Sequence, residues 1–263
     1  MPLDRPADRS KTEYRIKGRQ YTLLSDLHTH TVYSHGTGTV RDNVLAARER
    51  GVLRVGIADH GPAHLGFGVP RKKFARQKAE VLALREEFPD MEILQSVEAN
   101  ILADGRLDVR PEERGFFDYV CAGWHYGTVG GMTPKGIAST FENLARSTAA
   151  KATKPQLKRN TEAVVRAIEG GGICFLTHPG DKAPVDLLEV AAACARTGTL
   201  VELNTHHMSL TAADVRTMAI ADVRFLISSD AHSPARVGDF TEAVYLLLDA
   251  GIDLSRVVNL KVE

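Results

Sequence analysis

Short apolar runs alternate with segments of helical periodicity along most of this chain. The apolar runs predict seven strands, at residues 21–26, 53–58, 91–97, 118–123, 173–177, 200–203 and 223–228. The segments between and after them predict helices near 40–50, 71–88, 158–169, 185–197, 211–219 and 240–250. In the first helical segment, Val40, Val44 and Ala47 recur at helical spacing before Gly51, a residue suited to ending a helix.

A repeated strand, helix, strand order predicts an α/β fold with a parallel sheet and helices outside it. Such units can close into a barrel somewhat smaller than the eight-stranded form or remain an open doubly wound sheet, and the pattern alone leaves both open. No Pro/Gly/Ser-rich linker divides the 263 residues. We therefore expect a polar N-terminal tail at 1–20 and a single domain at 21–263. The least regular stretch, 126–157, predicts a long loop with a helix, of the kind that often covers a site.

Histidines and carboxylates stand at the carboxyl ends of the predicted strands. In chain order they are His28, His30, His35, His60, Glu98, His125, His178, Asp230 and His232. Seven of the ten histidines share this position. Active sites of α/β barrels form where the carboxyl ends of the strands converge, so these side chains are predicted to meet in one site.

The spacing of two pairs supports this prediction. His28 and His30 are two residues apart, so on an extended backbone both side chains point to the same face, and Asp230 and His232 repeat that spacing. In a closed barrel the first and last strands are neighbours, and the two pairs would face a common centre. Imidazole and carboxylate suit zinc, iron or manganese, and one tetrahedral metal needs about four ligands. The nine candidates therefore predict two or three metals with a bridging carboxylate.

Other polar residues near these positions have more ordinary interpretations. Three histidines are expected to be hydrogen-bonded structural residues: His64, His206 and His207. Three further residues are expected either to orient a ligand or to act as structural caps: Asp26, Asp59 and Asn204.

Composition and charge narrow the class of protein. The 33 Lys plus Arg residues balance the 33 Asp plus Glu residues, so no global field holds a nucleic acid or an anionic membrane. Cys121, Cys174 and Cys194 each sit in an apolar run and are expected to be small buried hydrophobes in a reducing compartment. The sequence contains neither a long apolar stretch nor a signal-peptide pattern at its start, which predicts a cytoplasmic protein without a membrane span. It does not indicate the oligomeric state.

Taken together, the motifs resemble those of the PHP family, which is named for polymerase and histidinol phosphatase. They are Asp26-Leu27-His28-Thr29-His30, Ser34-His35, Ala58-Asp59-His60, Glu98, His125, Thr177-His178-Pro179 and Ser229-Asp230-Ala231-His232. The similarity runs from about residue 21 to 260. Two segments look closest to the stand-alone bacterial phosphoesterase branch: Asp59-His60-Gly61-Pro62 and Val97-Glu98-Ala99-Asn100-Ile101.

This resemblance implies a distorted seven-stranded barrel and a site for three divalent metal ions, zinc, manganese or iron. One ion would be held by His28, His30, Glu98 and Asp230. Glu98 would be shared with a second ion, completed by His125 and His178. The third would be held by His35, His60 and His232, so all nine family positions carry a competent ligand.

The expected activity is that of a metal-dependent, histidinol-phosphatase-like enzyme that hydrolyses a small phosphomonoester by attack of a metal-bridging hydroxide. Glu98 would set the metal separation, and Asp230, a metal-bound water or a nearby histidine would protonate the leaving group. Arg236 is the preferred cation for the phosphate, because arginine can grip two oxygens at once. The other candidate cations are Arg71, Lys72, Lys73 and Lys182.

Three alternatives remain open on the sequence. A phosphodiesterase or 3′-exonuclease would use the same ligands, but the neutral charge and an aromatic content of 6% weigh against a long nucleic acid. A metal-binding interaction module without catalysis would be favoured by a lost ligand, and none is lost. Acyl or C–N hydrolysis by similar barrels usually uses a carbamylated lysine, and no lysine ends a predicted strand here.

Overall fold

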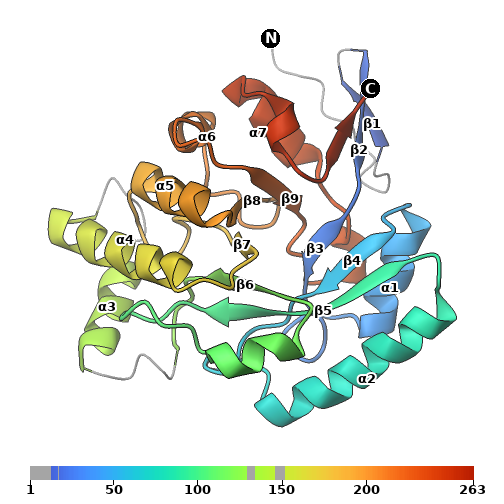
Figure 1. Ribbon diagram of the computed structural model, residues 1–263, viewed down its shortest axis with the longest axis horizontal. Coiled ribbons are helices and arrows are strands. Elements are labelled where there is room, and N and C mark those ends of the chain that lie inside the picture. The colour runs from blue at the N-terminus through green and yellow to red at the C-terminus, as the bar shows by residue number, and fades with distance from the viewer. Residues whose placement is uncertain (1–12, 17, 129–133, 146–151) are drawn as a thin grey trace.

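The computed structural model describes residues 13–16, 18–128, 134–145 and 152–263 (Figure 1). Seven parallel strands follow one another in chain order in a single sheet. They are β3 (Asp26–Thr29), β4 (Arg54–Ile57), β5 (Glu92–Asn100), β6 (Tyr119–Gly123), β7 (Phe175–Leu176), β8 (Leu200–Asn204) and β9 (Phe225–Ser228). The expected α/β class and the seven parallel strands are confirmed.

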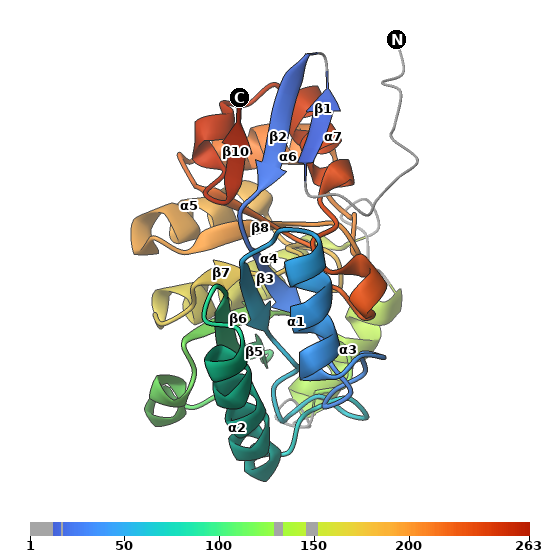
Figure 2. The same ribbon diagram turned by 90° about the vertical axis from the view of Figure 1, so that its right-hand side faces the viewer.

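Helices pack along the outer side of this sheet (Figures 1 and 2). They are α1 (Val40–Glu49), α2 (Arg71–Glu87), α3 (Pro134–Ala145), α4 (Lys154–Glu169), α5 (Leu187–Thr197), α6 (Ala212–Ala219) and α7 (Thr241–Ala250), with 3₁₀ turns η1 (Pro111–Phe116), η3 (Pro234–Arg236) and η4 (Leu254–Arg256). Sequence determines several of their starts. Thr39 caps α1 in a reciprocal pair with Asp42, and Thr211 caps α6 with Asp214 in the same way.

The sheet is nearly closed into a barrel, because the segment after β9 reaches β3. The amide of Ala231 donates to the carbonyl of His28, and the carbonyl of Ala231 accepts from the amide of His30. At the other end of the strands, the Asn259 side chain donates to Ile227 and Ser25. These bonds hold the first and last strands together, so a barrel is confirmed over an open doubly wound sheet.

The first predicted strand, 21–26, was wrong as a single element. Its beginning belongs to β2 (Arg19–Leu23), which pairs antiparallel with β1 (Glu13–Ile16) and β10 (Leu260–Val262) in a separate sheet. The barrel strand starts only at Asp26, so His28 lies within a strand instead of after it. No Gly or Pro separates the two strands, which only Leu24 and Ser25 connect, so the sequence gives no turn signal at the change of sheet. β1 and the start of β2 also fall within the expected polar tail, of which residues 1–12 and 17 lie outside the described residues.

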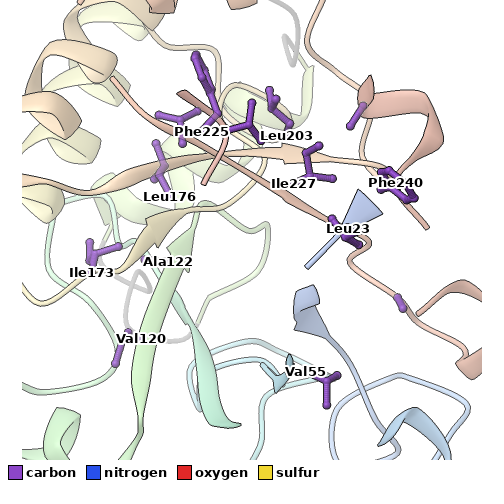
Figure 3. Close-up of a cluster of buried hydrophobic side chains, with 14 of the residues drawn as sticks. Leu23, Val55, Val120, Ala122, Ile173, Leu176, Leu203, Phe225, Ile227 and Phe240 are labelled. Atoms are coloured by element: carbon purple, nitrogen blue, oxygen red, sulfur yellow. The ribbon is translucent and has the colours of Figure 1, made fainter. Parts of the chain in front are cut away.

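Alternation along the strands produces two apolar clusters. One face of the sheet packs against the helices and includes Val120, Leu176, Leu203, Phe225 and Ile227 (Figure 3). The opposite face fills the barrel with a smaller cluster: Leu27, Ala58, Cys121, Phe175 and Leu226. Toward the carboxyl ends of the strands the barrel interior is polar, and the candidate ligands lie there.

Two further predictions are corrected by the structure. β5 continues to Asn100, so Glu98 is an interior strand residue and not the residue after the strand. The irregular stretch 126–157 contains α3, and α4 begins inside it at Lys154; residues 129–133 and 146–151 lie outside the described part.

None of the described helices is long and apolar enough to cross a membrane. Of the cysteines, Cys121 and Cys194 are buried, Cys174 is half-buried, and all three are free thiols.

Candidate metal centre

All nine predicted ligands gather at the carboxyl end of the barrel. Four overlapping groups have ligand atoms within 4.8 Å of one another: His30–His35–His60, His28–His30–Glu98, His30–Asp230–His232 and His60–Glu98–His125. His178 joins them, with Nε2 at 3.0 Å from Glu98 Oε1. Residues from β3, β5 and the loops after β4, β6, β7 and β9 therefore converge on one point.

Glu98 lies at the centre and its two carboxylate oxygens face different histidines. Oε1 is 3.2 Å from His125 Nε2 and 3.0 Å from His178 Nε2. Oε2 is 3.5 Å from His28 Nε2 and 3.6 Å from His30 Nε2. A carboxylate placed in this way has one oxygen for each of two neighbouring cations, which is the geometry of a bridging ligand.

Asp230 completes the group of side chains around Glu98 Oε2. Its Oδ1 lies 3.5 Å from His28 Nε2 and 3.0 Å from His30 Nε2, and these two nitrogens are 3.1 Å apart. His28, His30, Glu98 and Asp230 therefore present four ligand atoms to one small volume, as the spacing of the HxH pair predicts.

The remaining three candidates lie nearer the mouth of the site. The His35 ring is 4.8 Å from the His60 ring and 4.1 Å from the His232 ring. His60 also turns inward, with Nδ1 at 2.9 Å from Glu98 Oε2. His60 therefore lies between the mouth and the centre, and it belongs to the surroundings of Glu98 as well as to those of His35.

The donor set fits metal ions. Several buried polar atoms have no hydrogen-bond partner among the described residues, and five of them point into this site: His35 Nδ1, His60 Nδ1, Glu98 Oε2, His125 Nε2 and Asp230 Oδ1. A buried polar atom without a partner costs about 1–3 kcal/mol, so five in one place require an explanation. Imidazole nitrogens and carboxylate oxygens are the donors that zinc, manganese and iron accept.

The electrostatics of the site also favour cations. Burial alone would lower the pKa of His28, but the carboxylates of Asp230 and Glu98 raise it well above its ordinary value. Burial alone would raise the pKa of Glu98, but the imidazoles of His125 and His28 lower it well below its ordinary value. Burial lowers the pKa of His125 to about 3, so this ring stays neutral, which is the form that binds metal.

Buried partners fix the orientation of the ligand rings. His28 Nδ1 is 2.7 Å from Glu202 Oε1, and His125 Nδ1 is 2.9 Å from Asn100 Oδ1. Both oxygens accept from Nδ1, which turns Nε2 of each ring toward the site, where it would have to be unprotonated to bind a metal. Glu202 also accepts from the amide of His178 through Oε2, at 2.7 Å.

Neither Glu202 nor Asn100 was recognised from the sequence. The available signal was a carboxylate inside a buried apolar strand, since Glu202 is fully buried between Val201 and Leu203. An ionisable residue in that position needs a partner. Its alternation with Leu200 and Asn204 would have placed it on the same face as the ligands.

Among the residues with two open interpretations, Asn204 orients a ligand. Its amide donates to Asp230 Oδ2 at 3.0 Å and to Glu202 Oε2 at 2.9 Å. Asp26 and Asp59 bind the backbone and hydroxyls of loops, and Asp59 Oδ1 also lies 3.9 Å from Nδ1 of the candidate ligand His30. Asp26 accepts from the amides of Ser229 and Gly238. Asp59 accepts from the amide and the hydroxyl of Thr31 at 2.7 and 2.6 Å.

The three histidines expected to be structural all border the site. The His64 ring stacks on His60 at 4.7 Å, and the His206 ring stacks on His232 at 4.7 Å. His207 Nε2 lies 3.7 Å from Asp230 Oδ2. All ten histidines of the chain therefore lie in or around one site.

The candidate cations are placed differently. Arg236 donates from Nη2 to the carbonyl of Thr205 at 3.0 Å and lies 3.3 Å from Asp239. Arg71 pairs with Glu113 at 2.7 Å at the start of α2. Lys182 lies 3.5 Å from His207 Nδ1, close to the ligands. The role of Arg236 as a phosphate ligand stays a prediction.

Two ligand residues hold a strained backbone. His178 and Asp230 have φ angles of 28° and 48°, in the left-handed region that residues with a Cβ rarely adopt. Such a conformation costs on the order of 1–3 kcal/mol and persists only when the surroundings impose it. The coincidence of strain with two candidate ligands marks this end of the barrel as the functional one.

Comparisons with known proteins agree with this geometry. The family model described as "PHP domain" matches residues 26–206. A probable phosphatase of Shewanella sediminis is 28% identical over 247 residues, covering 90% of this chain and 89% of the relative. A probable phosphatase of Caldanaerobacter subterraneus is 29% identical over 263 residues, covering 94% and 92%. The crystal structure of histidinol phosphate phosphatase from Lactococcus lactis, complexed with zinc, L-histidinol and phosphate, superposes with a TM-score of 0.55 at 13% identity, covering 88% of this chain and 94% of that one. The similarity to this structure is one of fold.

Because the family model covers more than half of the residues and every motif of the metal centre is in place, the chain belongs to the PHP family.

Proposed function

We propose that this protein is a metal-dependent phosphatase that hydrolyses a small phosphomonoester at a centre of three divalent metal ions. The observation that carries the proposal is the convergence of nine candidate ligand side chains, with Glu98 at their centre. Five buried polar atoms of these side chains lack a hydrogen-bond partner among the described residues. The relatives named probable phosphatases, and the zinc, histidinol and phosphate bound by the protein of similar fold, support the same class of reaction.

The residues would hold the ions in three groups. His28, His30 and Asp230 would bind the first together with Glu98 Oε2, and His125 and His178 would bind the second together with Glu98 Oε1. His35, His60 and His232 would bind the third at the mouth. Divalent ions held here supply Lewis acidity for phosphate ester hydrolysis.

The chain's own groups set the conditions for that chemistry. Glu98 fixes how far apart the first two ligand groups lie, because both groups contact the same rigid carboxylate. By accepting from Nδ1, Glu202 and Asn100 turn the Nε2 atoms of His28 and His125 inward, where these atoms would bind metal without a proton. Arg236, on the loop after β9, is proposed to contribute a positive charge for the phosphate.

The test compares three substrate types on protein reconstituted with zinc, manganese or iron. We expect hydrolysis of a chromogenic phosphomonoester, slower hydrolysis of the bis-ester, no degradation of a labelled oligonucleotide, and loss of activity on chelation. Faster cleavage of the bis-ester or the oligonucleotide would identify a phosphodiesterase instead. A fully metal-loaded protein that hydrolyses none of the three, and none of a broad panel of phosphorylated metabolites, would contradict the proposal.

A further inference from the structure

Two basic side chains border the metal centre from opposite sides of the loop after β8. Lys182 lies on the loop after β7, and Arg236 lies in η3 after β9. Lys182 Nζ lies 3.5 Å from His207 Nδ1, and Arg236 Nη2 donates to the carbonyl of Thr205 at 3.0 Å, so both cations contact the loop after β8 beside the metal centre.

The two cations have different surroundings. The Arg236 guanidinium is bonded to the carbonyl of Thr205 and lies beside Asp239, so it already stabilises the loop after β8. The Lys182 ammonium is 2.6 Å from Asp181 Oδ2 and 3.5 Å from His207 Nδ1. An ammonium has three N–H donors, and these two contacts leave one donor without a partner among the described residues.

His207 connects Lys182 to the ligands. On one side, its Nδ1 faces Lys182 and Asp181. On the other side, its Nε2 lies 3.7 Å from Asp230 Oδ2, and its ring centre lies 5.3 Å from that of His178. The ammonium is therefore separated from two ligand residues by the width of a single imidazole. The Lys182 side chain is 27% exposed, so the ammonium is open to solvent beside these ligand residues.

We propose that Lys182 binds a non-bridging oxygen of the substrate's terminal phosphate and thereby makes the site selective for phosphomonoesters over diesters. This inference rests on the proposed function. A monoester carries a charge of about −1.5 to −2 at neutral pH and has three non-bridging oxygens. A diester carries a single charge and has two such oxygens. If ions held by the ligand residues took two phosphoryl oxygens, a monoester would keep a third non-bridging oxygen for Lys182, whereas a diester would have none left.

The central experiment compares Lys182→Ala with the wild-type protein, both fully metal-loaded. A hydrogen bond to a charged group contributes enough that we expect KM for the monoester and Ki for inorganic phosphate to rise by about 10- to 100-fold. The constants for the bis-ester should change by less than about 3-fold. Lys182→Arg should restore most of the phosphate affinity. Lys158→Ala is the matched control, because Lys158 is 78% exposed on α4, and it should leave all constants unchanged.

A second variant separates a direct contact from charge balance. Lys182→Ala leaves the neighbouring Asp181 carboxylate uncompensated, which by itself would repel phosphate. The double variant Asp181→Asn/Lys182→Ala has the same net charge as the wild type. Continued weak phosphate binding in the double variant supports direct contact, whereas wild-type constants would show that Lys182 only neutralises Asp181 and would overturn the proposal.

Calorimetric binding of inorganic phosphate to the metal-loaded protein gives a readout that does not need turnover. Equal phosphate affinity in wild type and Lys182→Ala would overturn the inference even if the wild type is an active phosphatase. Parallel losses for the monoester and the bis-ester, or loss of bound metal in Lys182→Ala, would also overturn it. If the wild type binds phosphate through Lys182 but hydrolyses no ester, the proposed function fails while this inference stands.

Discussion

The inner and outer parts of the metal centre are held in place in different ways. The inner part contains His28, Glu98, His125, His178 and Asp230, all buried. Their partners, Glu202, Asn100 and Asn204, are themselves buried. The outer part contains His35 and His232. Their rings contact each other and other histidine rings, and His232 Nδ1 lies 2.8 Å from the carbonyl oxygen of Asp230, whereas His35 Nδ1 has no hydrogen-bond partner among the described residues.

This difference bears on how tightly each part binds a metal. A ligand whose orientation is fixed before binding loses less conformational entropy when the ion arrives. The strained backbone of His178 and Asp230 shows that the inner part is fixed even at the expense of local stability. We therefore infer that the inner ions bind more tightly than the ion at the mouth, and four predictions test this inference.

The largest effect is expected for Glu98→Ala. Because one oxygen of Glu98 faces each inner ligand group, its loss should remove both inner ions together. Several kcal/mol of transition-state stabilisation would be lost, which lowers kcat/KM by roughly 10³-fold or more. Elemental analysis and steady-state kinetics measure the two effects, with Glu92→Gln at the exposed start of β5 as the control. Normal metal content with full activity would refute the bridging role.

A smaller effect is expected for Glu202→Gln. The amide keeps the volume of the side chain but removes the negative charge beside His28 Nδ1. Loss of such a partner typically weakens metal affinity by about 10- to 100-fold. Competition with a zinc-sensitive dye measures the affinity, and Glu189→Gln on the exposed start of α5 is the control. An affinity equal to that of the wild type would show that Glu202 does not orient the ligand.

His35→Ala should affect only the outer part. We expect this variant to bind about one ion fewer per chain while the inner ions stay bound, because the group of ligand atoms that contains His35 includes neither Glu98 nor Asp230. Stepwise removal of metal by a chelator should show the fast phase of the wild type missing in this variant. Simultaneous loss of all ions would mean that the two parts form one cooperative unit and that the comparison is wrong.

The smallest effect is a change in stability of the metal-free protein with pH. Burial lowers the pKa of His125 and of His35 to about 3, below the value of about 6.5 expected in the unfolded chain. These rings are neutral when the protein is folded. Their contribution to the free energy of unfolding is therefore complete above about pH 6.5 and is lost as the pH falls toward 3. His28 and His178 have raised pKa values, so they do not make the stability depend on pH below about pH 6.5, where both rings are protonated in the folded and the unfolded protein.

We therefore expect the Tm of the metal-free protein to fall by several degrees, on the order of 5 °C, between pH 6.5 and 5. Calorimetry in a chelating buffer measures this change. This fall in Tm should be smaller in His125→Asn, which lacks one of the histidines whose pKa is lowered. A Tm that stays constant or rises over this interval would contradict the buried, neutral state of these rings.

Sequence reasoning could predict which side chains gather at the candidate metal centre because strand ends and residue spacing are local properties. The pairs His28/His30 and Asp230/His232 follow from alternation along an extended backbone, and their convergence follows from barrel closure. Glu202 was missed although it is as buried as any ligand, because its role depends on His28, which is far away in the chain. The change of sheet between Leu23 and Asp26 was missed for a related reason, since pairing with Leu260 is determined by tertiary structure.

The central claim is that nine side chains form one centre that binds three cations, with two of them held by Glu98. The most direct test is the number of ions bound per chain after reconstitution with zinc, manganese or iron and removal of free metal. We expect about three ions per chain in the wild type and about one or fewer in Glu98→Ala. A wild-type protein that stays folded but binds no ion under all three conditions would contradict the account.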